Sequence, residues 1–199
     1  MKNWSDYLQS NGTLKNKLGI VDNAMLRTVE YSYSSQQQAF LEQRGYKLPN
    51  GIQLNGTSVN ELKLINDYLF GAIYDWAGHY REVDFNKTMG GTLTFFHPVE
   101  LFGNAEMDIQ RQLVSYAGLP VEKITIARAL GRIVTTINIF HPFREGNGRT
   151  IRVFTQVLAQ QKGLQLHFTA EQHRDYMRAN IEDDDELMAR VIFESLQFD

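Results

Sequence analysis

The spacing of apolar residues along the chain predicts a mainly α-helical protein. A helix is expected from about Asn23 to Arg44, because Asp22 can cap its first turn and Gly45 can end it. A second helix is expected from Ser58 to Gly78, where apolar residues recur at helical spacing and Ser58 with Glu61 forms a capping-box signature. The segment between these two helices is interpreted as a connector.

The pattern changes from helical to alternating beyond residue 80. Val83 and Phe85 alternate with polar residues, and so do Leu93 and Phe95. Met89-Gly90-Gly91 lies between the two alternating runs and supplies a turn. Two short alternating runs joined by a glycine turn predict a β-hairpin.

Helical spacing resumes after the hairpin and continues to the end of the chain. Further helices are expected from Pro98 to about Ala117, from Pro120 to Phe140, from near Gly148 to Lys162, and once or twice after Thr169. The expected fold class is therefore mainly α, with one hairpin before the later helices.

Composition narrows the classes of function. The 199 residues fit one compact unit. The net charge is −3, and acidic and basic residues are interleaved, so the sequence has no basic cluster that would bind nucleic acid or an anionic membrane. Neither is an expected partner. The absence of cysteine excludes disulfides and thiolate metal sites. No stretch approaches the ~20 apolar residues of a membrane-spanning helix, and the first residues lack a signal-peptide core, so a cytoplasmic location is expected.

The candidate chemistry lies between His141 and Arg152, which read His-Pro-Phe-Arg-Glu-Gly-Asn-Gly-Arg-Thr-Ile-Arg. Pro142 should end the preceding helix and bias His141 toward an extended conformation, which leaves the imidazole at a rim. A mostly neutral imidazole there can remove a proton from an attacking hydroxyl. The alternative is a helix-end histidine bonded to a backbone carbonyl. Phe143 is expected to anchor the loop in the core.

A phosphate site is expected next to this base. Gly146 and Gly148 permit positive φ angles and close approach of a ligand, and Asn147 adds an amide donor. A helix that begins near Gly148 also directs unpaired backbone N–H groups toward an anion. The alternative is an ordinary glycine turn.

Arg149 and Arg152 project from nearly the same face of the first helical turn, where cations oppose the helix dipole. A di- or triphosphate would compensate this placement, and a carboxylate partner within the fold is the alternative for each arginine. Glu145 supplies one hard oxygen for a Mg²⁺ ion that takes its other ligands from water and phosphates. A Walker motif is absent, and Pro142 breaks the helix that a zinc pair of His141 and Glu145 would require.

The segment matches the motif of the Fic family, His-x-Phe-x-Asp/Glu-Gly-Asn-Gly-Arg-x-x-Arg, at every specified position. The order of elements from about Ser58 to Asn180 also resembles the family core. The resemblance implies a Fic-type helical bundle, with residues 58–199 as the catalytic core and residues 1–57 as an N-terminal helical extension. It also implies transfer of AMP from ATP to a Ser, Thr or Tyr hydroxyl of a target protein, with pyrophosphate as the leaving group.

The resemblance assigns a role to each motif residue. The implied roles are His141 as the base, Glu145 as the holder of Mg²⁺, Gly146, Asn147 and Gly148 as the phosphate cradle, Arg149 as a stabiliser of the phosphates, and Arg152 as the holder of the γ-phosphate. The hairpin would form a flap that pairs with an extended segment of the target. Lys87 and Thr88 fall where the flap of similar proteins touches nucleotide, although an exposed turn lysine is commonly only solvated.

Many Fic proteins are silenced by a helix with the motif Ser/Thr-x-x-x-Glu-Gly/Asn. The nearest match here runs from Thr57 to Leu62, with leucine at the last position, and Glu61 is better explained by helix capping. The resulting hypothesis is that a separate small antitoxin supplies the inhibitory glutamate and that this chain is the toxin. Type II topoisomerase subunits are the preferred target, because relatives of the toxin type modify them.

Two other functions stay open. The scaffold could carry a phosphotransferase or another nucleotidyl or phospho-group transferase, or it could be a catalytically silent nucleotide- or protein-binding module. The acidic run from Glu182 to Glu186 is interpreted as a solvated helix start. The remaining histidines are interpreted as structural, namely His79, His97, His167 and His173.

Overall fold

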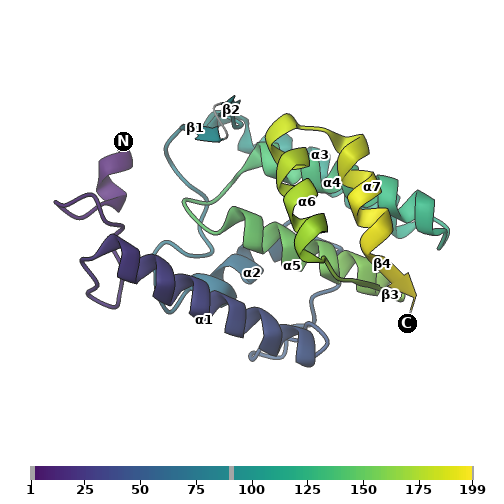
Figure 1. Cartoon of the computed structure of the whole chain (residues 1–199), viewed down its shortest axis with the longest axis horizontal. Coiled ribbons are helices and arrows are strands. Elements are labelled where there is room, and N and C mark those ends of the chain that lie inside the picture. Colours follow the sequence, from purple (N-terminus) through teal and green to yellow (C-terminus); the bar gives the residue numbers. More distant parts are fainter. Residues whose placement is uncertain (1–2, 90–91, 199) are drawn as a thin grey trace.

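The computed structural model describes residues 3–89 and 92–198, and in this part of the chain helices dominate (Figure 1). The α-helices are α1 (Asn23–Gln43), α2 (Glu61–Phe70), α3 (Phe102–Ala117), α4 (Lys123–Phe140), α5 (Asn147–Gln161), α6 (Ala170–Glu182) and α7 (Asp185–Ser195). The strands are β1 (Asn86–Met89), β2 (Thr92–Phe95), β3 (Leu164–Leu166) and β4 (Leu196–Phe198). The predicted fold class is confirmed. In the described residues, none of the helices has the length and apolar character needed to cross a bilayer.

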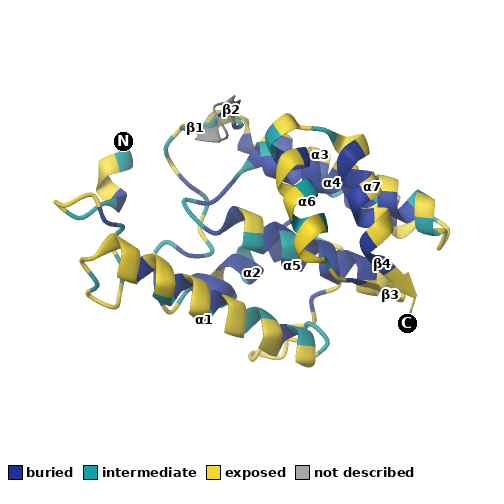
Figure 2. Ribbon diagram, viewed as in Figure 1, coloured by how far each residue is buried: buried dark blue, intermediate teal, exposed yellow. Residues whose placement is uncertain are grey.

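Helix α4 forms the centre of the core. Its buried stripe includes Ile126, Leu130, Ile133, Ile137 and Phe140, which is the helical spacing expected from the sequence. Helices α3, α5 and α7 surround it, and their inward faces are buried (Figure 2). Gly131 lets α7 approach closely, because a Cβ at this position would lie 2.8 Å from the backbone nitrogen of Ala189. This packing holds the carboxyl end of α4, and therefore His141, at a defined place.

Helix α1 lies along one side of the molecule, with one face exposed to solvent (Figure 2). It begins as predicted, because the Asp22 carboxylate accepts a hydrogen bond from Met25 N. It ends at Gln43, before Gly45 with its positive φ of 60°.

Helix α2 is shorter than predicted. It ends at Phe70, and the residues from Gly71 to Gly78 form turns, although Ile73 is still buried. The predicted capping box is also wrong, because Glu61 accepts hydrogen bonds from the backbone N–H groups of the loop before the helix, at Asn55, Gly56 and Thr57. Ile73 lies in a buried turn at a position that happens to continue the helical spacing of α2, so the pattern predicted a longer helix than the structure has. The Glu61 carboxylate stabilises the loop, because three neighbouring backbone N–H groups donate to it.

The hairpin is present, with shorter strands than expected. Strands β1 and β2 are antiparallel, and Asn86 pairs with Phe95. Val83 and Phe85 precede β1, and the Phe85 ring lies 5.1 Å from the Phe96 ring, centroid to centroid, while Gly90 and Gly91 lie outside the described residues. A second antiparallel pair, β3 with β4, was not predicted, because each strand has only three residues and the pairing joins distant parts of the chain.

Candidate active site

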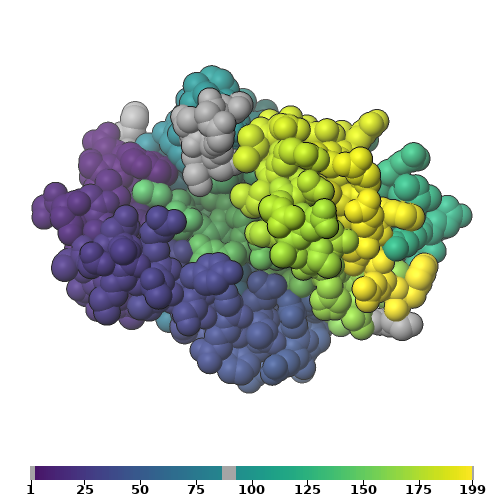
Figure 3. Space-filling model, in the orientation of Figure 1, coloured from purple at the N-terminus to yellow at the C-terminus, as the bar shows by residue number. Residues whose placement is uncertain are grey.

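A cavity of about 430 Å³ opens where α4 ends and α5 begins. All the predicted residues of the motif contribute to its lining, namely His141, Glu145, Gly146, Asn147, Gly148, Arg149 and Arg152. In the space-filling view the green motif region is recessed between the purple N-terminal region and the yellow-green α6 (Figure 3). The structure therefore brings the candidate base, carboxylate, glycines and arginines to one place.

His141 adopts the left-handed conformation, with φ 43° and ψ 59°, and not the extended one that Pro142 led us to expect. The left-handed conformation lets His141 N donate to Ile137 O at 3.0 Å, which closes the last turn of α4 while still avoiding the α region disfavoured before proline. The imidazole Nδ1 lies 3.2 Å from Asn138 O, and the ring stacks on Phe96 at 3.8 Å. An Nδ1–H bond to this carbonyl puts the lone pair of a neutral ring on Nε2, the nitrogen that a base uses.

Arg81 was not identified from the sequence, yet it joins the segment after the hairpin to the motif loop. Its guanidinium is buried and donates to His141 O at 2.9 Å and to His97 O at 2.5 Å. Burial lowers the pKa of Arg81, and the nearby Asp84 carboxylate opposes that shift. The sequence does not indicate that this arginine is buried. Its partners are mainly backbone carbonyl groups, which every residue has, so no particular residue type marks them.

Asn147 holds the shape of the loop. Its side chain is buried, with Oδ1 accepting from Phe143 N at 2.9 Å and Nδ2 donating to Phe143 O at 2.8 Å. Asn147 therefore fixes the loop conformation through these two bonds, and its predicted part in the phosphate cradle stays a prediction. Phe143 is buried in the core, as predicted.

Asn66 of α2 holds the same loop from below. This fully buried side chain donates to Glu145 O at 3.3 Å and to Thr150 Oγ1 at 3.1 Å, while its Oδ1 accepts from Gly78 N at 2.9 Å. A buried asparagine with every polar group engaged is a rigid support. The sequence pattern indicated only that α2 is a core helix.

The N-terminus of α5 faces the cavity. Gly146 occupies the N-cap position with φ 80°, and no side chain in the described residues caps this helix. Gly148 in the first turn is exposed, and a Cβ there would meet no atom of the protein within 4 Å. An uncapped helix start beside an open glycine is suited to an anion.

Glu145 is the candidate metal ligand. Its side chain is 38% exposed, and Oε1 accepts from Gly146 N at 3.1 Å. Among the described residues there is no group of three His, Cys, Asp or Glu side chains that could hold a metal ion. One carboxylate fits a Mg²⁺ ion that is bound mainly through phosphates and water, and it does not fit a cage made of protein ligands alone.

The two motif arginines have different surroundings. Arg149 pairs with the Glu30 carboxylate and donates to Ser34 Oγ at 2.8 Å, so the carboxylate alternative applies to this residue. Arg152 has no carboxylate within ion-pair distance among the described residues, and its Nη2 lies 3.4 Å from His173 Nδ1. Its Nε is buried without a hydrogen-bond partner in the described part of the chain. Arg152 is therefore the motif arginine whose charge no carboxylate compensates in the described part of the chain.

His173 was interpreted as structural, but it lines the cavity beside Arg152. Burial lowers its pKa, and the positive charge of Arg152 lowers it further. Nothing in the sequence around His173 connects it with the motif, since α6 reaches the site only through tertiary packing.

The side chains of the hairpin residues Lys87 and Thr88 lie outside the described part of the structure, so their predicted contact with nucleotide stays a prediction.

Comparison with known proteins agrees with this geometry. The Fic/DOC family model matches residues 56–159, more than half of the chain. The chain belongs to the Fic/DOC family. Protein adenylyltransferase VbhT of Bartonella schoenbuchensis is 31% identical over 189 residues, which cover 93% of this chain and 37% of VbhT. The probable protein adenylyltransferase Fic of Escherichia coli K12 is 30% identical over 169 residues, 84% of this chain and 78% of that protein.

Solved structures show the same fold. The BepC protein of Bartonella tribocorum, crystallised with bound AMPPNP, aligns with a TM-score of 0.81 at 22% identity and covers 98% of both chains. The N-terminal Fic domain of a Bep effector from Bartonella sp. AR 15-3 also aligns with a TM-score of 0.81 at 22% identity, covering 97% of this chain and 92% of that one. The predicted Fic-type architecture is confirmed, and the names of the sequence relatives agree with the predicted enzyme class, a protein adenylyltransferase. This Fic chain spans only about a third of VbhT.

Proposed function

We propose that this Fic chain transfers AMP from ATP to a Ser, Thr or Tyr hydroxyl of a target protein. The observation that carries the proposal is the uncapped N-terminus of α5, which faces one cavity together with Arg152 and the oriented imidazole of His141. An anion-binding helix start, a cation with available charge and a base are the parts that nucleotidyl transfer to a hydroxyl requires.

In the proposed reaction, Nε2 of His141 takes the proton of the target hydroxyl as its oxygen attacks the α-phosphorus of ATP. The new P–O bond forms while the bond to the β-phosphate oxygen breaks, and pyrophosphate leaves with its electron pair. The α5 N–H groups and the arginines stabilise the charge on the phosphates. Glu145 would hold Mg²⁺, which neutralises phosphate charge when bound.

The flap provides a place for the target. A two-stranded hairpin has outer edges with unpaired backbone groups, and an extended peptide can pair with such an edge. Leu93 and Phe95 on β2 are 51% and 64% exposed, so apolar side chains of a target segment would find contacts beside the edge. Type II topoisomerase subunits are the candidate targets.

Regulation is proposed to come from a separate antitoxin that supplies a glutamate to Arg152. Two observations support this proposal. Arg152 has no carboxylate partner among the described residues, and Glu61, the nearest match to an inhibitory glutamate, is committed to three backbone N–H groups. Purification of this chain from its native cells tests the idea, because a small protein that co-purifies should suppress transfer and should bind an Arg152→Ala chain more weakly.

The first experiment is a Mg²⁺-dependent transfer assay on bacterial lysate with α-labelled and γ-labelled ATP. Protein label from α-labelled ATP alone is expected, and His141→Ala should reduce it at least about a hundredfold. His79→Ala is the matched histidine control, since His79 does not line the cavity. Label from γ-labelled ATP would show phosphotransfer instead. Unchanged labelling by His141→Ala would overturn the assignment of the base.

A further inference from the structure

Helix α1 turns a partly polar face toward the core. Its buried residues are Leu26, Glu30, Ser34 and Leu41, so two of the four buried positions are polar. Glu30 is 8% exposed. A carboxylate is retained at such a position only if other groups compensate its charge, because burying an unpaired charge is costly. The compensating groups identify what this face of α1 does.

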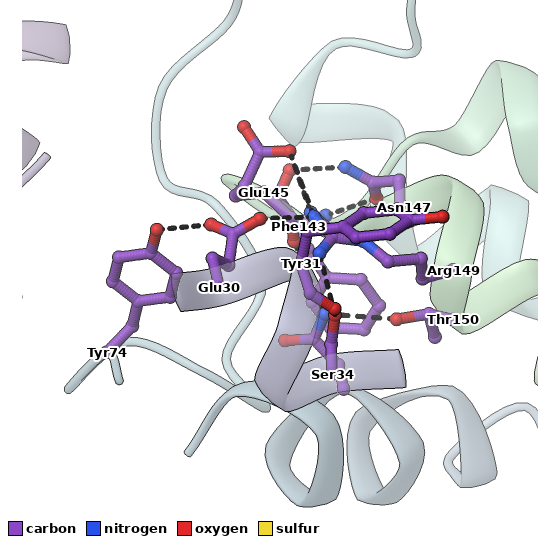
Figure 4. Close-up of polar contacts among 11 residues, drawn as sticks. Glu30, Tyr31, Ser34, Tyr74, Phe143, Glu145, Asn147, Arg149 and Thr150 are labelled. Atoms are coloured by element: carbon purple, nitrogen blue, oxygen red, sulfur yellow. Dashed lines mark hydrogen bonds and ion pairs between the residues drawn. The ribbon is translucent and has the colours of Figure 1, made fainter. Parts of the chain in front are cut away.

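Both oxygens of the Glu30 carboxylate are engaged. Oε1 pairs with Nη2 of Arg149, and Oε2 accepts a hydrogen bond from the Tyr74 hydroxyl. Ser34, one helical turn further along α1, accepts from Nη1 of the same arginine at 2.8 Å. Figure 4 shows the chain of contacts from Tyr74 through Glu30 to Arg149, with Ser34 on the other side of the guanidinium.

These contacts confine Arg149. The guanidinium also lies over the Phe70 ring, 4.6 Å from its centroid, and Phe70 supports the motif loop at Gly146. If Arg149 swung away, the Glu30 carboxylate would lose its only ion-pair partner among the described residues. The Tyr74 hydroxyl remains a donor, because burial and the Glu30 carboxylate raise its pKa strongly. Arg152, by contrast, has no such anchor.

Three N–H bonds of Arg149 remain for other partners, because a guanidinium has five and α1 engages two. Arg149 lines the active-site cavity and also a second cavity of about 740 Å³ beside α1. Its fixed position holds these remaining N–H donors at the wall of the site, so they are already oriented when a phosphate binds.

We infer that Glu30 is a positioning residue for the transfer reaction. It acts through Arg149, and α1 is thereby a part of the catalytic apparatus even though it precedes the segment matched by the family model. This inference rests on the proposed function in one respect, namely that Arg149 contacts the phosphates. By holding the Arg149 guanidinium in place before ATP binds, Glu30 reduces the conformational entropy that this side chain loses on binding, without contacting the substrate itself.

The test compares Glu30→Gln with Glu42→Gln, a matched control on the same helix whose carboxylate accepts from Gln156 Nε2 at 2.9 Å. Three quantities are measured: the affinity for Mg²⁺-ATP by calorimetry, the KM and kcat of transfer, and the rotation of the Arg149 guanidinium by ¹⁵N NMR. Glu30→Gln should speed the rotation, weaken ATP binding about tenfold and raise KM more than it lowers kcat. Glu42→Gln should change none of these.

A double-mutant cycle separates positioning from general stability. On an Arg149→Lys background, Glu30→Gln should cause no further loss of ATP affinity, because its effect passes through the guanidinium. Equal losses on both backgrounds, or unchanged rotation in Glu30→Gln, would overturn the inference. Ser34→Ala is the second variant, with a smaller change in the same direction, in case Glu30→Gln fails to fold. Rotation and binding need no transfer, so a chain that binds ATP but modifies nothing would count against the proposed function alone.

Discussion

Gly146 and Gly148 are glycines for different reasons. At Gly146 the backbone has φ 80°, and a Cβ would lie 2.2 Å from the Phe70 ring, so the fold itself requires glycine. At Gly148 the protein leaves open space, and the helix would be slightly more stable with alanine. The requirement at Gly148 therefore comes from outside the chain, as expected if a phosphate lies against it.

The two glycines thus predict opposite results on substitution. Gly146→Ala should lower the free energy of unfolding by at least about 2 kcal/mol, through the left-handed backbone and the clash. Gly148→Ala should raise it by about 0.5 kcal/mol while weakening ATP binding. Urea unfolding and ATP titration of both variants measure this, and tight ATP binding by Gly148→Ala would contradict the phosphate cradle.

His173 predicts how stability depends on pH. Its pKa is lowered in the folded protein by burial and by Arg152, so the unfolded state binds a proton more readily. Stability from this group is present above the unfolded pKa of about 6.5 and is lost as the pH falls toward the lower folded value. His173→Gln should therefore lose less stability than the wild type between pH 7.5 and 5.5 in urea unfolding. An equal loss in both proteins would show that the residue does not contribute.

Most of the helices could be predicted from the sequence, because the residues at which they begin and end depend on nearby residues. Asp22 caps α1 through a residue three positions away, and Gly163, with φ 68°, ends α5. The errors occurred at α2. The helix stops at Phe70, and the Glu61 carboxylate accepts from backbone N–H groups of the loop immediately before the helix, a local alternative to the capping box that the spacing of Ser58 and Glu61 does not exclude.

The bonds of Glu61 to the loop before α2 predict the effect of replacing it. Glu61→Gln replaces one acceptor oxygen by a donor and leaves an N–H of the loop at Asn55 to Thr57 unpaired, so the free energy of unfolding should fall by about 1 to 2 kcal/mol. Transfer activity should not rise, because Glu61 restrains the loop and not Arg152. Thermal unfolding and the labelling assay measure both, and a stable variant with increased transfer would instead reveal internal inhibition.

The predicted division into an extension of residues 1–57 and a core of residues 58–199 rests on sequence motifs alone. The structure places Glu30 and Ser34 of the extension against Arg149 of the core. Leu26 and Leu41 of α1 also belong to the main apolar cluster. The two parts are expected to fold as one cooperative unit.

Truncation tests this cooperativity. A chain of residues 58–199 should melt well below the full chain and bind ATP poorly, because it loses the apolar face of α1 and the partners of Arg149. Differential scanning calorimetry of the two chains provides the comparison. A truncated chain with an unchanged melting temperature would mean that the extension is a separate unit.

Local patterns in the sequence are sufficient to predict the helical class, the hairpin, the motif and the family, because each depends on residues within a few positions of one another. Which polar groups meet depends instead on how the elements pack. Arg149 and Glu30 are 119 residues apart, and Arg81 and His141 are 60 apart, so no local pattern connects them. A buried charge is indistinguishable from an exposed one in a sequence, since its partner is chosen only when helices and loops pack together.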